Sequence, residues 1–128
     1  MFRLGKTFSF EASHQLPHHD GKCANLHGHS WRFTVVFEGD LLQREGSETG
    51  MLLDYSRISA IVKPLIAEYL DHRHLNNLLL NPTSEALAVW LYDHIATELP
   101  HGLLALLHSV IVHETCTSEC EYWPTRRP

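Results

Sequence analysis

Two stretches of alternating side chains limit the fold of this chain more than any other feature. Residues 2–14 and residues 27–38 each place apolar side chains on one face and polar side chains on the other. Alternation over this length predicts two half-buried β-strands. The segment between them is rich in loop-forming residues, so the two strands most simply pair antiparallel. The apolar rows are Phe2, Leu4, Phe8, Phe10 and Ala12 in the first stretch, and Trp31, Phe33, Val35 and Phe37 in the second.

The pattern becomes helical after residue 53, and two helices are predicted. Apolar residues over 58–70 recur at three- and four-residue spacing, and Pro64 inside this run is expected to kink or divide the helix. The NPTSE segment that follows is typical of a helix start, with Thr83 or Ser84 as the N-cap. Helical spacing then continues until Pro100 ends it.

Two further strands complete the predicted fold. The β-branched residues 110–112 favour a third strand, and a short fourth strand is expected around residues 121–123. The order ββααββ predicts an α+β fold, with a four-stranded antiparallel sheet and two helices on one face. A length of 128 residues indicates one domain over 1–128. Such a sheet has two open edges, and assembly of several subunits into a barrel is one way to close them.

Composition excludes several classes of function. The chain has 10 basic and 15 acidic residues, and the resulting net charge of −5 argues against a nucleic-acid partner bound through its phosphates. No stretch approaches the roughly 18 apolar residues of a membrane span. The first residues lack the apolar core of a signal peptide, so a cytoplasmic location is expected by default. Three cysteines, an odd number, in a chain without an export signal argue against a disulfide framework.

Three of the 11 histidines are predicted to converge at one end of the strand pair. His27 and His29 project from the same face of the second strand, about 6.6–7 Å apart along the chain. His14 continues the apolar row of the first strand, so the three imidazoles meet if the two apolar rows share a face. Three nitrogen ligands suit an open, catalytic zinc site. The alternative is that His27 and His29 lie in a loop and His14 is a core residue with an ordinary hydrogen-bond partner.

The cysteines leave more than one interpretation open. Cys23 lies four residues before His27, where a thiol can be a fourth metal ligand, a general base or a small buried side chain. Cys116 and Cys120 have the spacing of a metal-ligand pair, but no further ligand pair completes such a site. We therefore interpret these two as structural.

Two other positions carry candidate acid–base chemistry. Asp71 and His72 end the first helical region, and a carboxylate beside an imidazole can hold a proton donor in one tautomer. A helix C-terminus also attracts histidine for dipole reasons alone, and His74 competes for the same role. Glu114 ends the third strand, where its carboxylate can accept two hydrogen bonds from a guanidine-like edge or pair with an arginine.

A series of motifs, in order over nearly the whole chain, resembles the 6-pyruvoyltetrahydropterin synthase family. The resemblance is closest to its bacterial branch, the 6-carboxytetrahydropterin synthases of queuosine biosynthesis. The combination of CxxxHGH with LDHxxLN and PTSE is the most specific part. The motifs are FEASH (10–14), CANLHGH (23–29), GMLLDY (50–55), LDHRHLN (70–76), NPTSE (81–85) and ETCTS (114–118).

The resemblance implies a tunnelling fold (T-fold), with subunits assembled into barrels, commonly a homohexamer, and active sites at subunit interfaces. It implies conversion of 7,8-dihydroneopterin triphosphate to 6-carboxy-5,6,7,8-tetrahydropterin, acetaldehyde and triphosphate, with no redox cofactor. The implied zinc ligands are His14, His27 and His29. The implied proton acceptor is Cys23, with Asp71 and His72 as its relay partners. Glu114 would anchor the pterin and take part in proton relay, and Thr83 and Ser84 would lie near the pterin.

One residue departs from the family pattern, and two other functions are kept open. Glu119 stands in the CTSxC turn, where the family usually has a small residue. The basic residues that would meet the triphosphate are not ranked by the sequence; the candidates are Lys22, Arg73, Arg126 and Arg127. The alternatives are the sister activity, triphosphate elimination to 6-pyruvoyltetrahydropterin, and a non-catalytic metal-binding protein.

Overall fold

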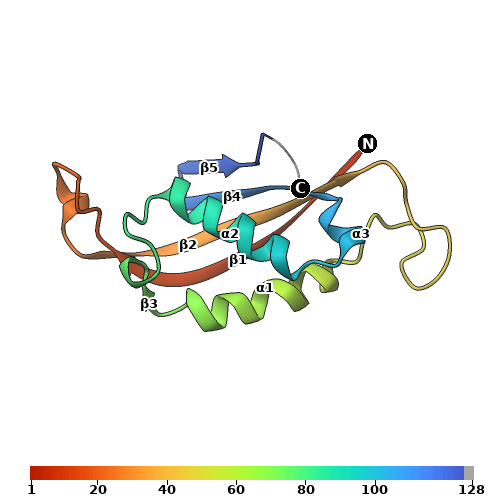
Figure 1. Cartoon of the computed structure of the whole chain (residues 1–128), viewed down its shortest axis with the longest axis horizontal. Helices are drawn as coiled ribbons and strands as arrows, with labels where there is room; N and C mark the ends of the chain where they lie inside the picture. The colour runs from red at the N-terminus through yellow and green to blue at the C-terminus, as the bar shows by residue number, and fades with distance from the viewer. Residues whose placement is uncertain (126–128) are drawn as a thin grey trace.

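The computed structural model describes residues 1–125 of the chain, so Arg126 and Arg127 lie outside the described residues. Two antiparallel hairpins form most of the sheet, and the helices lie between them in sequence (Figure 1). The strands are β1 (Phe2–His14), β2 (His27–Gly39), β3 (Arg73–His74), β4 (Leu107–Thr115) and β5 (Ser118–Tyr122). The helices are α1 (Tyr55–Tyr69), α2 (Ser84–Glu98) and α3 (His101–Leu104), with 3-10 turns η1 (Lys22–Ala24) and η2 (Leu75–Asn77).

The sheet has five strands in the order β3-β1-β2-β4-β5, one more than the sequence predicts. The predicted α+β class and the antiparallel pairing of the first two strands are confirmed, with His14 opposite His27 as the last pair of the β1–β2 ladder. The additional strand, β3, pairs in parallel with β1 through Ala12 and Ser13. Two residues are too few to show a periodicity, so no sequence pattern could reveal this strand.

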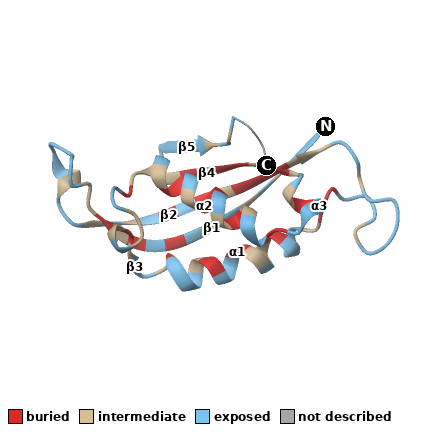
Figure 2. Cartoon of the chain, in the orientation of Figure 1, coloured by how far each residue is buried: buried red, intermediate tan, exposed pale blue. Residues whose placement is uncertain are grey.

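Both long helices cover one face of the sheet, and the core lies between the two layers (Figures 1 and 2). The apolar row of β2 is completely buried there, including Trp31, Phe33 and Phe37. Burial of each such side chain contributes about 1.5–3 kcal/mol, which makes this row a major source of stability. α1 is one continuous helix of 15 residues despite Pro64, so the expectation that this residue divides it is wrong. Among the described residues, no helix is long and apolar enough to cross a membrane.

Side chains cap both long helices at their N-termini. The Asp54 carboxylate accepts a hydrogen bond from the Ser56 amide at 2.9 Å, and this bond is the main cause that holds the pKa of Asp54 below its ordinary value. Thr83 Oγ1 accepts the Ala86 amide at 3.1 Å, which identifies Thr83 rather than Ser84 as the N-cap of α2. The polar NPTSE segment therefore fixes where α2 begins.

The Thr83 cap gives a testable stability difference. Thr83→Ala removes the acceptor for the Ala86 amide, and we expect it to lower the free energy of unfolding by about 1 kcal/mol. Ser84→Ala is the matched control, because Ser84 is the first helical residue and not the cap. Urea unfolding of both variants measures the difference, and an equal loss in the two would contradict the assignment of the cap.

Candidate functional site

The three imidazoles that the sequence singles out lie together at the end of the β1–β2 hairpin. One ligand nitrogen from each of His14, His27 and His29 falls within 4.8 Å of the others. The ring centroids are 4.5 Å apart for His14 and His27, 5.1 Å for His14 and His29, and 4.9 Å for His27 and His29. All three residues belong to strands, so the alternative of a His-Gly-His loop is wrong and the predicted convergence is confirmed.

Backbone carbonyls orient two of these rings. His14 is completely buried, and its Nδ1 donates to the Pro82 carbonyl at 2.9 Å. His27 Nδ1 donates to the Asn25 carbonyl at 2.7 Å. Because a carbonyl oxygen only accepts, each bond places the proton on Nδ1 and leaves Nε2 with a free lone pair.

Two nitrogens of the cluster lack the partner that a buried polar atom normally has. The Nε2 atoms of His14 and His29 are buried and make no hydrogen bond within the described residues. Burial is the largest cause that lowers the pKa of His14 and of His29, which favours their neutral, ligand-competent form. Buried nitrogen lone pairs held in one place, each neutral and unpaired, fit the demands of a metal ion.

A carboxylate lies directly beside the imidazoles. Glu114 Oε1 is 3.4 Å from His14 Nε2 and 3.7 Å from His29 Nε2, distances of ion-pair type but too long for good hydrogen bonds. The charge of this carboxylate opposes the effect of burial on the pKa of both histidines. Glu114 comes from β4, which pairs with β2, so the sheet itself brings it to the cluster. Within residues 1–125, Glu114 thus lies beside histidines and forms no ion pair with an arginine.

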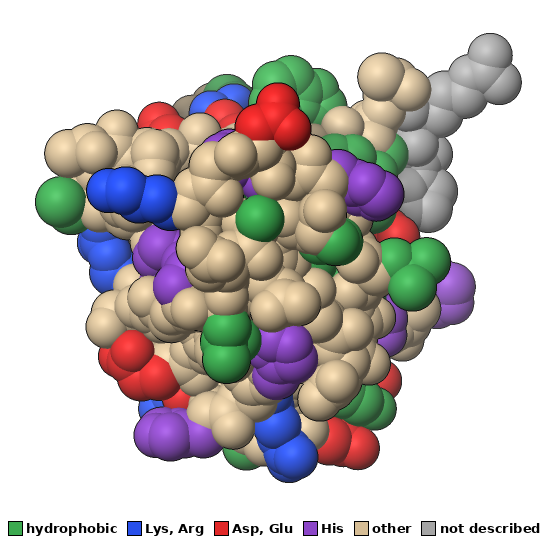
Figure 3. Space-filling model, turned by 90° about the vertical axis from the view of Figure 1, so that its left-hand side faces the viewer, with side chains coloured by type: hydrophobic (Ala, Val, Ile, Leu, Met, Phe, Trp, Pro, Cys, Tyr) green, Lys and Arg blue, Asp and Glu red, His purple; other side chains and the backbone are tan. Residues whose placement is uncertain are grey.

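Cys23 lies in the loop that joins the two strands of the cluster. It is half-buried in η1, and its carbonyl accepts the Leu16 amide at 2.7 Å. The set of mutually close ligand atoms consists of the three imidazoles and does not include the Cys23 thiol. The arrangement can therefore offer three nitrogen ligands to a metal ion, the number found in open zinc sites. Figure 3 views this end of the molecule, where several histidine side chains reach the surface.

Asp71 and His72 form a hydrogen-bonded pair at the outer edge of β1. His72 Nδ1 lies 3.0 Å from Asp71 Oδ2, and Asp71 Oδ1 accepts the Glu11 amide at 2.9 Å. The Glu11 amide first, and His72 second, hold the pKa of Asp71 below its ordinary value. His72 has a left-handed backbone with φ of 58°, fixed by a 2.6 Å bond from its amide to the Glu11 carbonyl. An exposed imidazole in this rare conformation, held by a carboxylate, is typical of a functional position.

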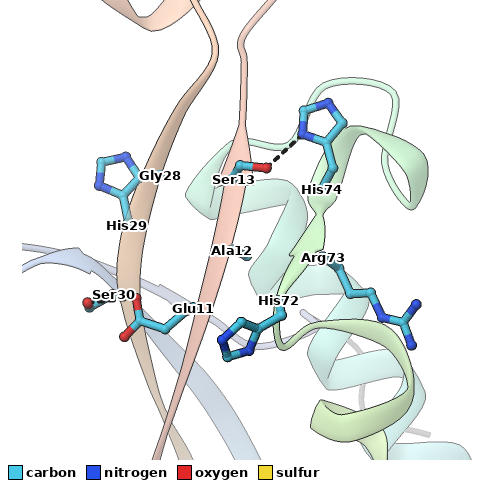
Figure 4. Close-up of a pocket in the computed structure, with 9 residues that line it drawn as sticks. All are labelled: Glu11, Ala12, Ser13, Gly28, His29, Ser30, His72, Arg73 and His74. Atoms are coloured by element: carbon cyan, nitrogen blue, oxygen red, sulfur yellow. Dashed lines mark hydrogen bonds between the residues drawn. The ribbon is translucent and has the colours of Figure 1, made fainter.

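His72 borders an open hollow of about 580 Å³ (Figure 4). Glu11, Ser13 and Ser30 line this hollow, and along β1 and β2 they alternate with the residues whose side chains face the core. The hollow therefore opens mainly on the face of the sheet opposite the core, and His29 of the imidazole cluster also lines it. No hydrogen bond or ion pair within residues 1–125 joins the Asp71–His72 pair to Cys23 or to the imidazole cluster.

His74 takes a different partner from His72. Its Nδ1 lies 3.0 Å from the Ser13 hydroxyl, the contact drawn in Figure 4. Of the two histidines that compete in the sequence, only His72 has a carboxylate partner within the described residues. The structure therefore favours His72 as the member of a proton relay.

Comparison with known proteins identifies the family. The profile described as 6-pyruvoyl tetrahydropterin synthase matches residues 3–125, which include every site residue above. The chain belongs to this family. A 6-carboxy-5,6,7,8-tetrahydropterin synthase from Synechocystis is 48% identical over 128 residues, covering 98% of this chain and 96% of that protein. A protein of the same name from Haemophilus influenzae is 33% identical over 140 residues, covering 95% and 99%.

A solved structure supports the fold of this 6-pyruvoyl tetrahydropterin synthase family member. The Caenorhabditis elegans 6-pyruvoyl tetrahydropterin synthase matches it with a TM-score of 0.80 at 23% identity, over 97% of this chain and 96% of the other. This likeness confirms the predicted T-fold.

Two residues that support the cluster in this family member were not recognised from the sequence. Asn76 accepts the Gln15 amide at 2.9 Å and donates to the Gln15 carbonyl at 2.8 Å, so it fixes the chain immediately after His14. Pro82 orients His14 through its carbonyl. Both lie in motifs that the sequence displays, but their partners are more than 60 residues away, and no local pattern indicates them.

The unusual Glu119 makes its own contact in the β4–β5 hairpin. Its carboxylate lies 3.8 Å from His113 Nδ1, one residue before Glu114. Glu119 is exposed, so this ion pair contributes little to stability. Nearby, Cys116 and Cys120 are both free thiols, and burial raises the pKa of Cys120.

Proposed function

We propose that this protein is a zinc-dependent 6-carboxy-5,6,7,8-tetrahydropterin synthase, a carbon–carbon lyase that serves queuosine biosynthesis. The reaction converts 7,8-dihydroneopterin triphosphate and one molecule of water to 6-carboxytetrahydropterin, acetaldehyde and triphosphate. The observation that carries the proposal is the cluster of three imidazoles, in which two buried Nε2 atoms beside Glu114 have no hydrogen-bond partner within the described residues. The choice among pterin reactions is supported by the relatives of that name, one of them 48% identical. The proposal takes residues 1–128 as one domain acting in the cytoplasm.

The metal ligands in this proposal are His14, His27 and His29. Their neutral nitrogens and the absence of Cys23 from the ligand set suit zinc with an open coordination position. When bound there, zinc supplies Lewis acidity that makes C–H bonds next to the substrate's oxygens more acidic. Pro82 and Asn25 keep the His14 and His27 rings oriented while this happens.

The other site residues bind the pterin and move protons. Glu114 anchors the amino and ring N–H edge of the pterin, because a carboxylate can accept two parallel hydrogen bonds from it. Cys23 removes the activated proton as a thiolate, since the thiolate and not the thiol is the reactive form of cysteine. The Asp71–His72 pair exchanges protons with the substrate side chain, with Nδ1 of His72 tied to Asp71 and its Nε2 free. Thr83 and Ser84 lie near the pterin in this scheme.

A complete site of this kind requires more than one subunit. No hydrogen bond or ion pair within residues 1–125 joins the Asp71–His72 pair to Cys23 or to the imidazoles, so we propose that it serves the zinc site of a neighbouring copy. The open edges of β1 and β5 offer the surfaces for such an assembly, because within the described chain residues 2–10 of β1 pair only with β2. A homohexamer whose subunits assemble into barrels would close the open sheet edges and bring the Asp71–His72 pair of one subunit to the zinc site of another.

Identification of the products tests the proposed reaction. Purified zinc-loaded protein incubated with 7,8-dihydroneopterin triphosphate is expected to release one acetaldehyde for each triphosphate. Triphosphate without acetaldehyde, together with 6-pyruvoyltetrahydropterin, would establish the sister elimination instead. No turnover, with several weakly bound metal ions per chain, would establish a metal-binding protein.

A further inference from the structure

A second cavity, between β1 and α1, brings two lysines together. Its volume is about 370 Å³, within the range of about 300–1,000 Å³ that small-molecule sites occupy. Lys6 from β1 and Lys63 from α1 both line it, together with the polar residues Thr7 and Ser9. Asp71 also lines it, so this cavity and the hollow beside His72 meet at the Asp71–His72 pair.

The two ammonium groups have no ion-pair partner among the described residues. Neither Lys6 nor Lys63 forms an ion pair with any residue in the described range 1–125, although the protein has 15 acidic residues and a net charge of −5. The only carboxylate lining the cavity, Asp71, has both oxygens engaged, by the Glu11 amide and by His72. Two uncompensated cations in one cavity of an acidic protein favour an anionic ligand.

We propose that this cavity, lined by Lys6, Lys63 and Ser9, is the subsite for the triphosphate of the substrate. The inference rests on the proposed function, which supplies a substrate with a triphosphate tail. The cavity lies next to the Asp71–His72 pair, so one subunit provides both the proton relay and the phosphate contacts. This cavity brings two basic side chains together, whereas the hollow at Arg73 contains one basic side chain and the Glu11 carboxylate, and Lys22 lies in the hairpin loop.

Binding of inorganic triphosphate to the zinc-loaded protein, measured by calorimetry, tests the subsite directly. We expect Lys6→Gln and Lys63→Gln each to raise the Kd about tenfold and the double variant about 100-fold, because each removes a charge-assisted contact. Any zinc that triphosphate removes from the protein would be removed equally from all variants, so the differences between their Kd values would remain. Arg44→Gln is the matched control, since Arg44 is an exposed cation in the β2–α1 loop and does not line the cavity.

A second ligand separates phosphate binding from a general disturbance of the site. The Kd of 7,8-dihydroneopterin, which lacks the triphosphate, is expected to stay within twofold in every variant. An unchanged triphosphate Kd in the double variant, or a change only in subunit assembly, would overturn the subsite. If the protein failed to turn over the substrate but the lysine variants still lost triphosphate binding, the subsite would stand and the proposed function would fail.

Discussion

His27→Ala is expected to lose its zinc and its activity while remaining folded. The substitution removes one of the three proposed ligands. Loss of a residue that only orients a metal ligand weakens metal affinity roughly 10–100-fold, so loss of a ligand itself should weaken it more. His27 is the most suitable ligand to replace, because it is only half-buried, whereas His14 is completely buried and its loss would leave the Pro82 carbonyl unpaired. Metal analysis after dialysis measures zinc per chain, and circular dichroism measures folding.

The matched control for this experiment is His18→Ala. His18 is an exposed histidine of the same hairpin loop and is not part of the cluster. It should keep one zinc per chain and full activity. A full complement of zinc in folded His27→Ala would show that this residue is not a ligand.

Mixed assemblies of two inactive variants are expected to regain activity. Cys23→Ala removes the proposed base and His72→Asn removes the relay, and each alone should lower kcat about 10²–10⁴-fold while retaining zinc. If each site combines Cys23 of one subunit with His72 of another, random mixing leaves about a quarter of the sites intact. Asparagine is used at 72 because it tolerates the left-handed backbone there. Co-expression with two different tags, purification through both and steady-state kinetics provide the measurement.

The result distinguishes two arrangements of the active site. A site built within one chain would carry a defect in every subunit of the mixture, and no activity would return. Assemblies that each contain a single variant, mixed only at the time of assay, are the control for contamination. Absence of recovery in verified mixed assemblies would refute the shared site.

The parts of the fold that follow from local patterns could be predicted from the sequence. Alternation placed His14, His27 and His29 on the buried face, and the antiparallel β1–β2 pairing then brings them together. The start of α2 could also be predicted, because its N-cap lies within the NPTSE segment.

What could not be predicted depends on contacts between distant residues. The parallel strand β3 exists only because the chain after α1 returns to the edge of β1. That pairing places Arg73 and His74, which directly follow the Asp71–His72 pair, beside Ala12 and Ser13 at the edge of the sheet. The orientation of His14 by Pro82 likewise joins residues 68 positions apart.

The left-handed backbone at His72 lowers the stability of the folded protein, and the protein nevertheless has an imidazole at this position. For a residue other than glycine, such a conformation costs about 1–2 kcal/mol, and glycine would adopt it without that cost. A variant selected for heat resistance alone would therefore tend to lose the side chain at this position. Replacing this one residue by glycine would raise the resistance of the protein to heat and lower its turnover.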